Sequence, residues 1–212
     1  MDLLIIRHAQ STFNTGNFDQ VDGGLTGLGR RQAKLLGNRL QPDPPECLFV
    51  SPMTRTIETA VVALQQVVGL RAVLWPLLHE RIGGDMSRYV GRPVSDLLRT
   101  YPDFTWMDES PAERWWPVAD ERAEDVVARA RAVLDTLSRL SAVRRVALIT
   151  HNVFAQRLLE EITPEASGCL ASHRFTPGAI THAIMREGRR GAVVHMDDDS
   201  HLLNLDALMT EI

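Results

Sequence analysis

Three short apolar runs, each ending abruptly at polar residues, constrain the fold of this chain most strongly. The runs are Leu3 to Ile6, Cys47 to Val50 and Val146 to Thr150. Short apolar runs bounded by polar residues are typical of fully buried strands. In an open α/β sheet, ligands bind just outside the carboxyl ends of such strands. The residues that follow the three runs are therefore expected to meet at one site.

Helical segments separate these runs and predict an α/β fold. The expected helices run from Thr26 to Leu40, about Thr54 to Val67, about Glu121 to Leu140 and Val153 to Ile162. A further parallel strand is expected at Ala72 to Trp75, and a hairpin of Ala179 to Met185 with Ala192 to Met196 predicts an antiparallel edge. The sequence thus predicts a layered, mostly parallel central sheet flanked by helices, in one domain over residues 1–212.

Residues of about 81–120 interrupt this alternation and predict a small irregular and helical insertion over the active site. Pro93 fits the first turn of a short helix through about Leu98. The stretch from Thr105 to Pro117 has no clear periodicity and contains Trp106, Trp115 and Trp116. These tryptophans either pack on an apolar or ring-bearing substrate or close a satellite core, and both interpretations stay open.

The side chains that follow the three apolar runs suit phosphoryl chemistry. Arg7 and His8 follow the first run, Arg55 follows the second at the start of a helix, and His151 follows the third. Guanidinium groups bind phosphate oxygens with bidentate geometry, and helix N-termini offer free N–H groups to anions. Neutral imidazole is a nucleophile available near neutral pH.

Composition excludes several other classes of protein. The formal net charge of −4 gives no field that favours nucleic acid or an anionic membrane. Lys34 is the only lysine and precedes leucine, so a phosphate-binding loop of the Gly-Lys-Ser/Thr kind is absent. Cys47 and Cys169 are too few for a disulfide framework, and no apolar stretch reaches the length of a membrane span. We expect a cytoplasmic protein.

No metal site is expected from the sequence. The run Asp197 to Asp199 lies near His195 and His201, but acidic runs before a turn are usually solvated. We therefore expect neither a metal nor a cofactor.

The order of these motifs resembles the histidine phosphatase superfamily. The resemblance rests on Arg7-His8 with Asn14, on Leu25-Thr26 with Gly29, on Ser51 to Arg55 with Thr59-Ala60, on Leu78-His79-Glu80 with Gly84, and on Thr150-His151. It spans roughly Leu3 to Leu203, and the order of the motifs carries it rather than any single motif.

The resemblance implies roles for seven residues. His8 would attack phosphorus and become phosphohistidine, while Arg7, Arg55 and His151 would hold the phosphoryl oxygens. Glu80 would protonate the leaving oxygen, with Asp85 and Glu121 as the next carboxylates to test. Asn14 would be an auxiliary phosphate contact, and Asn152 would either point into the pocket or cap the following helix.

Two positions depart from the family pattern, which more often has glycine after each histidine. This chain has Ala9 and Asn152 there. The Ala9 methyl group is expected to tighten the backbone against the phosphate. These departures bear on rate and substrate shape rather than on the class of reaction.

The resemblance implies a metal-independent phosphomonoester hydrolase that acts on a small phosphorylated metabolite. A cofactor-dependent phosphoglycerate mutase of the same superfamily is the first alternative, since it shares every residue named. The other is a catalytically weak regulatory module that binds a phosphorylated ligand. The identity of the substrate and the assembly, for which a homodimer is one option, stay open.

Overall fold

A computed structural model gives the structure of the protein. It describes residues 1–17, 21–84, 87–108, 112–117, 119–140, 142–166, 170, 172–186 and 190–203. No helix in this described part is long and apolar enough to cross a membrane.

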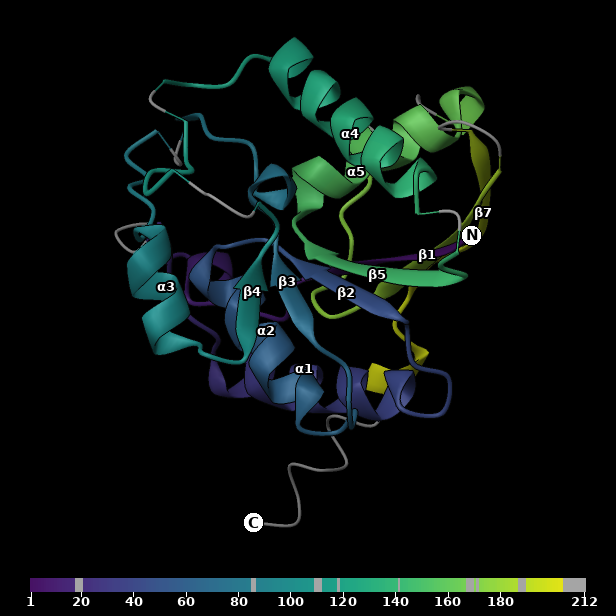
Figure 1. Cartoon of the computed structure of the whole chain (residues 1–212), viewed down its shortest axis with the longest axis horizontal. Coiled ribbons are helices and arrows are strands. Elements are labelled where there is room, and N and C mark those ends of the chain that lie inside the picture. The colour runs from purple at the N-terminus through teal and green to yellow at the C-terminus, as the bar shows by residue number, and fades with distance from the viewer. Residues whose placement is uncertain are drawn as a thin grey trace.

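A seven-stranded, mostly parallel sheet forms the centre of the fold, as the sequence predicts (Figure 1). The strand order is β4-β3-β2-β5-β1-β6-β7; the pairings of β6 with β1 and with β7 are antiparallel, and the other pairings are parallel. The hairpin at the end of the chain therefore adds the expected antiparallel edge. The strands are β1 (Asp2–Arg7), β2 (Cys47–Val50), β3 (Ala72–Leu74), β4 (Phe104–Trp106), β5 (Arg145–Thr150), β6 (Ile180–Met185) and β7 (Gly191–Asp198).

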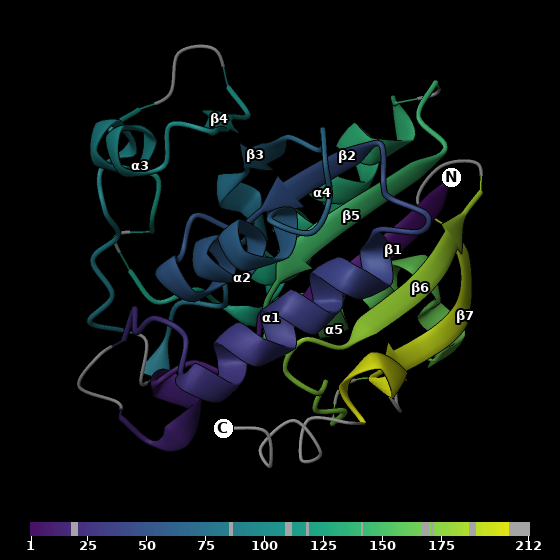
Figure 2. The ribbon, with the colours of Figure 1, turned by 90° about the horizontal axis from the view of Figure 1, so that it is seen from below.

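Helices cover both faces of this sheet (Figures 1 and 2). The α-helices are α1 (Gly27–Leu40), α2 (Thr54–Leu64), α3 (Val94–Thr100), α4 (Ala123–Ser138) and α5 (Asn152–Ile162). Short 3-10 turns are η1 (Phe13–Thr15), η2 (Pro76–Leu78), η4 (Pro164–Ala166) and η5 (Ser200–Leu202). The second helix ends earlier than predicted, and the chain then turns at Gly69, whose φ of 82° favours glycine.

Alternation along the strands divides the core into two layers. In β1, Leu3 and Ile5 pack with residues of α4 and α5, whereas Leu4 and Ile6 pack with residues of α1 and α2. All four side chains are buried, which explains why the run reads as continuously apolar. The same arrangement gives the chain its helix, sheet, helix layering (Figure 2).

The carboxyl ends of β1, β2 and β5 lie side by side at one edge of the sheet. Arg7 pairs with Thr150 across β1 and β5, and Val50 pairs with Ile149 across β2 and β5. His8, Ser51 and His151, the next residues along each chain segment, are therefore neighbours, as the apolar runs predict.

The tryptophan-containing segment differs in part from the prediction of an irregular insertion. Phe104 to Trp106 form β4, which pairs in parallel with β3 at the edge of the sheet, and Trp106 packs on the core beneath. Pairing with an existing strand edge stabilises this three-residue strand, although its sequence has no recognisable period. Trp115 and Trp116 pack against Met53, Ile82 and Tyr89, so they close a satellite core.

Candidate active site

The structure brings all seven predicted site residues to the same edge of the sheet. A cavity of about 560 Å³ lies there, and six of the seven line it. The lining residues are Arg7, His8, Phe13, Asn14, Arg55, Glu80, Arg81, Gly83, Gly84, Asn152, Val153 and Arg174. The seventh, His151, is fully buried next to His8, with the two ring centroids 5.1 Å apart.

Hydrogen bonds fix the tautomer of His8. Its Nδ1 lies 2.7 Å from the carbonyl oxygen of Ala9, and a carbonyl only accepts, so Nδ1 carries the proton. The lone pair is then on Nε2, to which the Nε–H of Arg55 donates at 3.2 Å. Burial, together with the charges of Arg55 and Arg7, holds the pKa of His8 well below its ordinary value. The ring is therefore neutral near neutral pH, as a nucleophile has to be.

His151 has one ring nitrogen bonded and the other without a partner. Its Nε2 lies 2.8 Å from the hydroxyl oxygen of Ser51, which also accepts from the backbone N–H of Met53 at 3.5 Å. Among the described residues no other acceptor is bonded to this buried hydroxyl, so Ser51 donates to Nε2 and the proton of His151 is on Nδ1. That Nδ1 is buried without a hydrogen-bond partner in the described part of the chain. An incoming anion would satisfy this donor.

Backbone carbonyl groups hold the two predicted arginines, which line the same cavity as His8. Arg7 donates to the carbonyl of Phe175, while its Nε is buried without a partner among the described residues. Arg55 donates to the carbonyl of Val21 at 3.2 Å and lies 3.9 Å from Asp22. Burial lowers the pKa of both arginines, and the negative charge of Glu80 opposes that shift. Both groups remain cations at physiological pH.

Asn14, Asn152 and Ala9 differ in their relation to the cavity. Asn14 closes a turn by accepting from the N–H and hydroxyl of Ser11, and it also lines the cavity. Asn152 lines the cavity and accepts from the N–H of Phe175 at 2.9 Å; His151 is the N-cap residue of α5, so Asn152 does not cap it. The Ala9 methyl group does not line the cavity, because it is buried in a small apolar cluster. Its effect on the backbone against the phosphate stays a prediction.

Glu80 lies at the N-terminus of α5. Its carboxylate oxygens accept from the backbone N–H groups of Val153 at 3.2 Å and Phe154 at 3.1 Å, and from that of Arg81 at 2.9 Å. Unpaired N–H groups and the helix dipole favour a carboxyl group at such a position. The preceding turn is held to β5 by Thr150, whose hydroxyl donates to the carbonyl of Leu78. These contacts aim the Glu80 side chain at the cavity.

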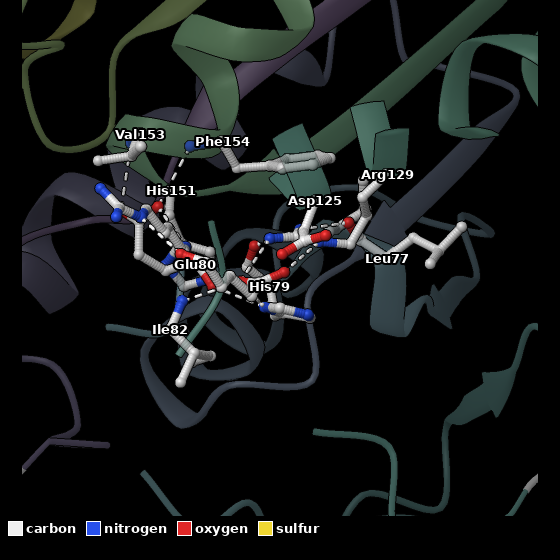
Figure 3. A network of polar contacts seen from close by, with 12 residues as sticks. Leu77, His79, Glu80, Ile82, Asp125, Arg129, His151, Val153 and Phe154 are labelled. Carbon is white, nitrogen blue, oxygen red and sulfur yellow. Dashed lines mark hydrogen bonds and ion pairs between the residues drawn. The ribbon is translucent and has the colours of Figure 1, made fainter. Parts of the chain in front are cut away.

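A buried ion pair supports the loop that carries Glu80 (Figure 3). The guanidinium group of Arg129 binds both carboxylate oxygens of Glu121 at 3.1 Å and donates to the carbonyls of Leu77 and His79. Glu121 in turn accepts from the N–H of Ile82. Burial and the Arg129 charge lower the pKa of His79 to about 3. Glu121 is thus committed to this pair and does not line the cavity, while Asp85 lies outside the described residues.

Replacing Arg129 by methionine is expected to lower the free energy of unfolding by about 3–5 kcal/mol, because Glu121 would then be buried without its partner. Urea denaturation measures this loss. Arg131→Met is the matched control. Arg131 is in the same helix as Arg129, but it is exposed and pairs with Glu161 of α5. A much smaller loss is expected for Arg131→Met. Equal losses in the two variants would show that the buried ion pair stabilises the protein no more than the exposed one.

The structure adds two residues that the sequence prediction did not assign. Ser51 orients His151, and although it belongs to the recognised Ser51 to Arg55 motif, only the β2–β5 pairing shows its role. Arg174 lines the cavity from the segment between α5 and β6, where no local pattern identifies it.

The acidic run near the C-terminus makes structural contacts. Asp197 accepts from the N–H of Thr176, and Asp198 pairs with Arg39. Within the described ranges no group of His, Cys, Asp and Glu has an arrangement that could hold a metal ion. Cys47 is a free thiol, and Cys169 lies outside the described residues.

Comparison with known families gives one match over nearly the whole chain. A model of the histidine phosphatase superfamily (branch 1) matches residues 3–199. This range contains both histidines, both arginines and Glu80.

Individual relatives fall into two functional groups. The 2,3-bisphosphoglycerate-dependent phosphoglycerate mutase of Tropheryma whipplei (strain Twist) is 37% identical over 170 residues, which cover 74% of this chain and 76% of that protein. Phosphoserine phosphatase 1 of Hydrogenobacter thermophilus is 26% identical over 155 residues, 71% of each protein. Among solved structures, Bacillus stearothermophilus YhfR superposes with a TM-score of 0.71 at 22% identity, over 95% of this chain and 98% of that one. This last likeness concerns the fold.

Proposed function

The chain belongs to the histidine phosphatase superfamily, branch 1, and from that premise we propose that it is a metal-independent phosphomonoester hydrolase acting through a phosphohistidine on His8. Its substrate is a small phosphorylated metabolite. Relatives named as phosphatases and as phosphoglycerate mutases both perform phosphoryl chemistry, which supports the class of reaction.

One observation carries the proposal: the imidazole of His8, neutral and with its tautomer fixed, lies among buried donors that have no acceptor within the described part of the chain. The lone pair of His8 is on Nε2, next to the cavity. The unpartnered donors are Nε of Arg7 and Nδ1 of His151. Buried polar groups are normally hydrogen-bonded, so unsatisfied donors around a nucleophile indicate an anion-binding site.

In the first transfer, the Nε2 lone pair of His8 forms a bond to phosphorus while the bond from phosphorus to the ester oxygen breaks. The Nε–H of Arg55 donates to Nε2 of His8 in the free protein. During the transfer this N–H donates to a phosphoryl oxygen instead. Arg7 and His151 stabilise the charge on the other oxygens. Glu80, in its protonated form, gives its proton to the departing alkoxide.

In the second transfer, the Glu80 carboxylate takes a proton from water as the water oxygen attacks the phosphohistidine. The bond from Nε2 to phosphorus breaks, and inorganic phosphate leaves with His8 neutral again. One imidazole thus serves as nucleophile and then as leaving group, which divides one difficult step into two easier ones.

The phosphoglycerate mutase reaction is the second candidate, because the mutase of Tropheryma whipplei is 37% identical to this chain. In that reaction, a second hydroxyl group rather than water would accept the phosphoryl group. The difference between the two lies in the acceptor and not in His8, Arg7 or Arg55.

Assays in EDTA-containing buffer separate these functions. We expect release of inorganic phosphate from p-nitrophenyl phosphate and from a panel of phosphorylated metabolites. Incubation of 3-phosphoglycerate with catalytic 2,3-bisphosphoglycerate is expected to give little 2-phosphoglycerate. Efficient interconversion would replace the hydrolase by the mutase. Absence of both activities, with phosphate esters still bound, would leave the binding module as the function.

A further inference from the structure

Two arginines at the mouth of the cavity, Arg81 and Arg174, have no role in the transfer of the phosphoryl group. Both line the cavity, and both side chains are exposed. Arg81 donates from Nε to the carbonyl of Glu121 at 3.2 Å. Among the residues that the structure describes, neither guanidinium group forms an ion pair. They are therefore available cations beside the proposed phosphate site.

Other arginines with sequence positions near Glu80 are already occupied or lie elsewhere. Arg92 and Arg99 both bind the carboxylate of Asp96. Arg88 lines a separate, smaller cavity of about 210 Å³. Among the described arginines from Arg81 to Arg99, Arg81 is the one that lines the active-site cavity.

The charges around the cavity exceed what one phosphate group needs. Four guanidinium groups and one carboxylate line it. Arg7 and Arg55 are the less exposed pair, flank His8 and suffice for a phosphate dianion. Arg174 is close enough to Arg7 to act on it electrostatically, because its positive charge, in addition to burial, lowers the pKa of Arg7. Four guanidinium cations against one carboxylate and a phosphate dianion leave the cavity lining with a net positive charge, and among the described residues Arg81 and Arg174 have no carboxylate partner that offsets them.

Both arginines are next in sequence to residues that contact the proposed phosphate site. Arg81 directly follows Glu80, the proposed proton donor to the ester oxygen. Arg174 directly precedes Phe175, whose carbonyl binds Arg7 and whose N–H binds Asn152. Both are exposed and line the same cavity as His8, so they lie within the space that a group attached to the ester oxygen would share.

We infer that Arg81 and Arg174 form a second anion site, which selects phosphate monoesters whose alcohol part carries a carboxylate or a further phosphoryl group. Guanidinium groups fork onto either anion with bidentate geometry, so the site adds orientation as well as attraction. This inference rests on the proposed phosphatase function, whose substrate class it narrows.

Matched substrate pairs test the inference. O-phospho-L-serine and O-phosphoethanolamine differ only in a carboxylate, and propane-1,3-diol bisphosphate and its monophosphate differ only in a phosphoryl group. We expect kcat/KM of the unaltered protein to be about tenfold or more higher for the more anionic member of at least one pair. The pair that shows the preference identifies which anion the site takes.

Arg81→Gln and Arg174→Gln are each expected to reduce that preference by about tenfold, mainly through KM. Hydrolysis of p-nitrophenyl phosphate, which has no second anion, is the reference in each variant, and a smaller loss is expected there than for the more anionic substrates. Arg144→Gln is the matched control, because Arg144 is 91% exposed and pairs with Glu46 away from the cavity. Equal kcat/KM within both pairs, or an unchanged preference in both variants, would overturn the second anion site.

Binding measurements separate this failure from failure of the proposed function. If the protein hydrolyses no ester at all, the phosphatase proposal fails. Calorimetric titration with the same pairs then still measures whether Arg81 and Arg174 bind the second anion. Tighter binding of the more anionic member, lost in Arg81→Gln and Arg174→Gln, supports the site. Equal binding within both pairs refutes it.

Discussion

Replacing His8 by alanine is expected to abolish hydrolysis of phosphate monoesters, with a loss on the order of 10⁴-fold or more in kcat. The variant keeps the donors of Arg7, Arg55 and His151 but has no group that can form the bond to phosphorus. Steady-state phosphate release measures the loss. His195→Ala is the matched control, since His195 is exposed on β7, and its activity should be unchanged.

The same experiment has a direct chemical readout. Rapid quenching of the unaltered protein with labelled substrate in alkali should trap phosphate on the chain, and acid should release it, as expected for a phosphoramidate. His8→Ala should carry no label. Near-normal turnover in the alanine variant, or label that survives acid, would exclude the phosphohistidine mechanism.

The response to pH follows from the burial of His8. Its pKa lies well below the ordinary value because burial and two neighbouring arginines disfavour the imidazolium. The nucleophile therefore stays neutral in mildly acidic solution, and protonation of His8 does not limit the rate there. A fall in rate near the ordinary histidine pKa would have to come from another group.

The sheet and the meeting of the strand ends could be predicted because their signal is local. Each apolar run is a buried strand whose neighbours are helices, and parallel pairing then brings Arg7 beside Thr150 without further information. The edge strand Phe104–Trp106 could not be found this way, since pairing with β3 rather than its own pattern stabilises it. The tryptophans were ambiguous for a related reason: only tertiary packing on Met53 and Tyr89 decides what Trp115 and Trp116 cover.

The site likewise has residues whose position follows from the local sequence and residues whose role depends on tertiary contacts. His8, His151 and the arginines follow strands directly, so their sequence positions already imply their place. The partners that orient them come from distant segments: Ser51 lies 100 residues from His151, and Arg129 lies 50 residues from the His79 carbonyl that it binds. Arg174 has no pattern at all around it. Long-range contacts of this kind follow from the packed structure and not from the motif.

Replacing Glu80 by glutamine is expected to have the second-largest effect, and its size should depend on the leaving group. Glutamine keeps the size of the side chain and one acceptor oxygen, so it retains one of the two bonds from the α5 N–H groups, but it has no acidic proton to give. An alkyl phosphate leaves as a strongly basic alkoxide and should lose on the order of a hundredfold or more in rate. A nitrophenyl phosphate leaves as a stabilised phenolate and should lose much less.

This comparison belongs in the pre-steady-state burst, where formation of the phosphohistidine is observed before Glu80 is needed to activate water. Glu124→Gln, an exposed change in the first turn of α4, is the control and should leave both burst rates unaltered. Equal losses for the two substrates in the burst would show that Glu80 does not protonate the leaving oxygen. Glu121 could not replace it, because both its carboxylate oxygens are held by Arg129. Asp85 would then be the next carboxylate to substitute.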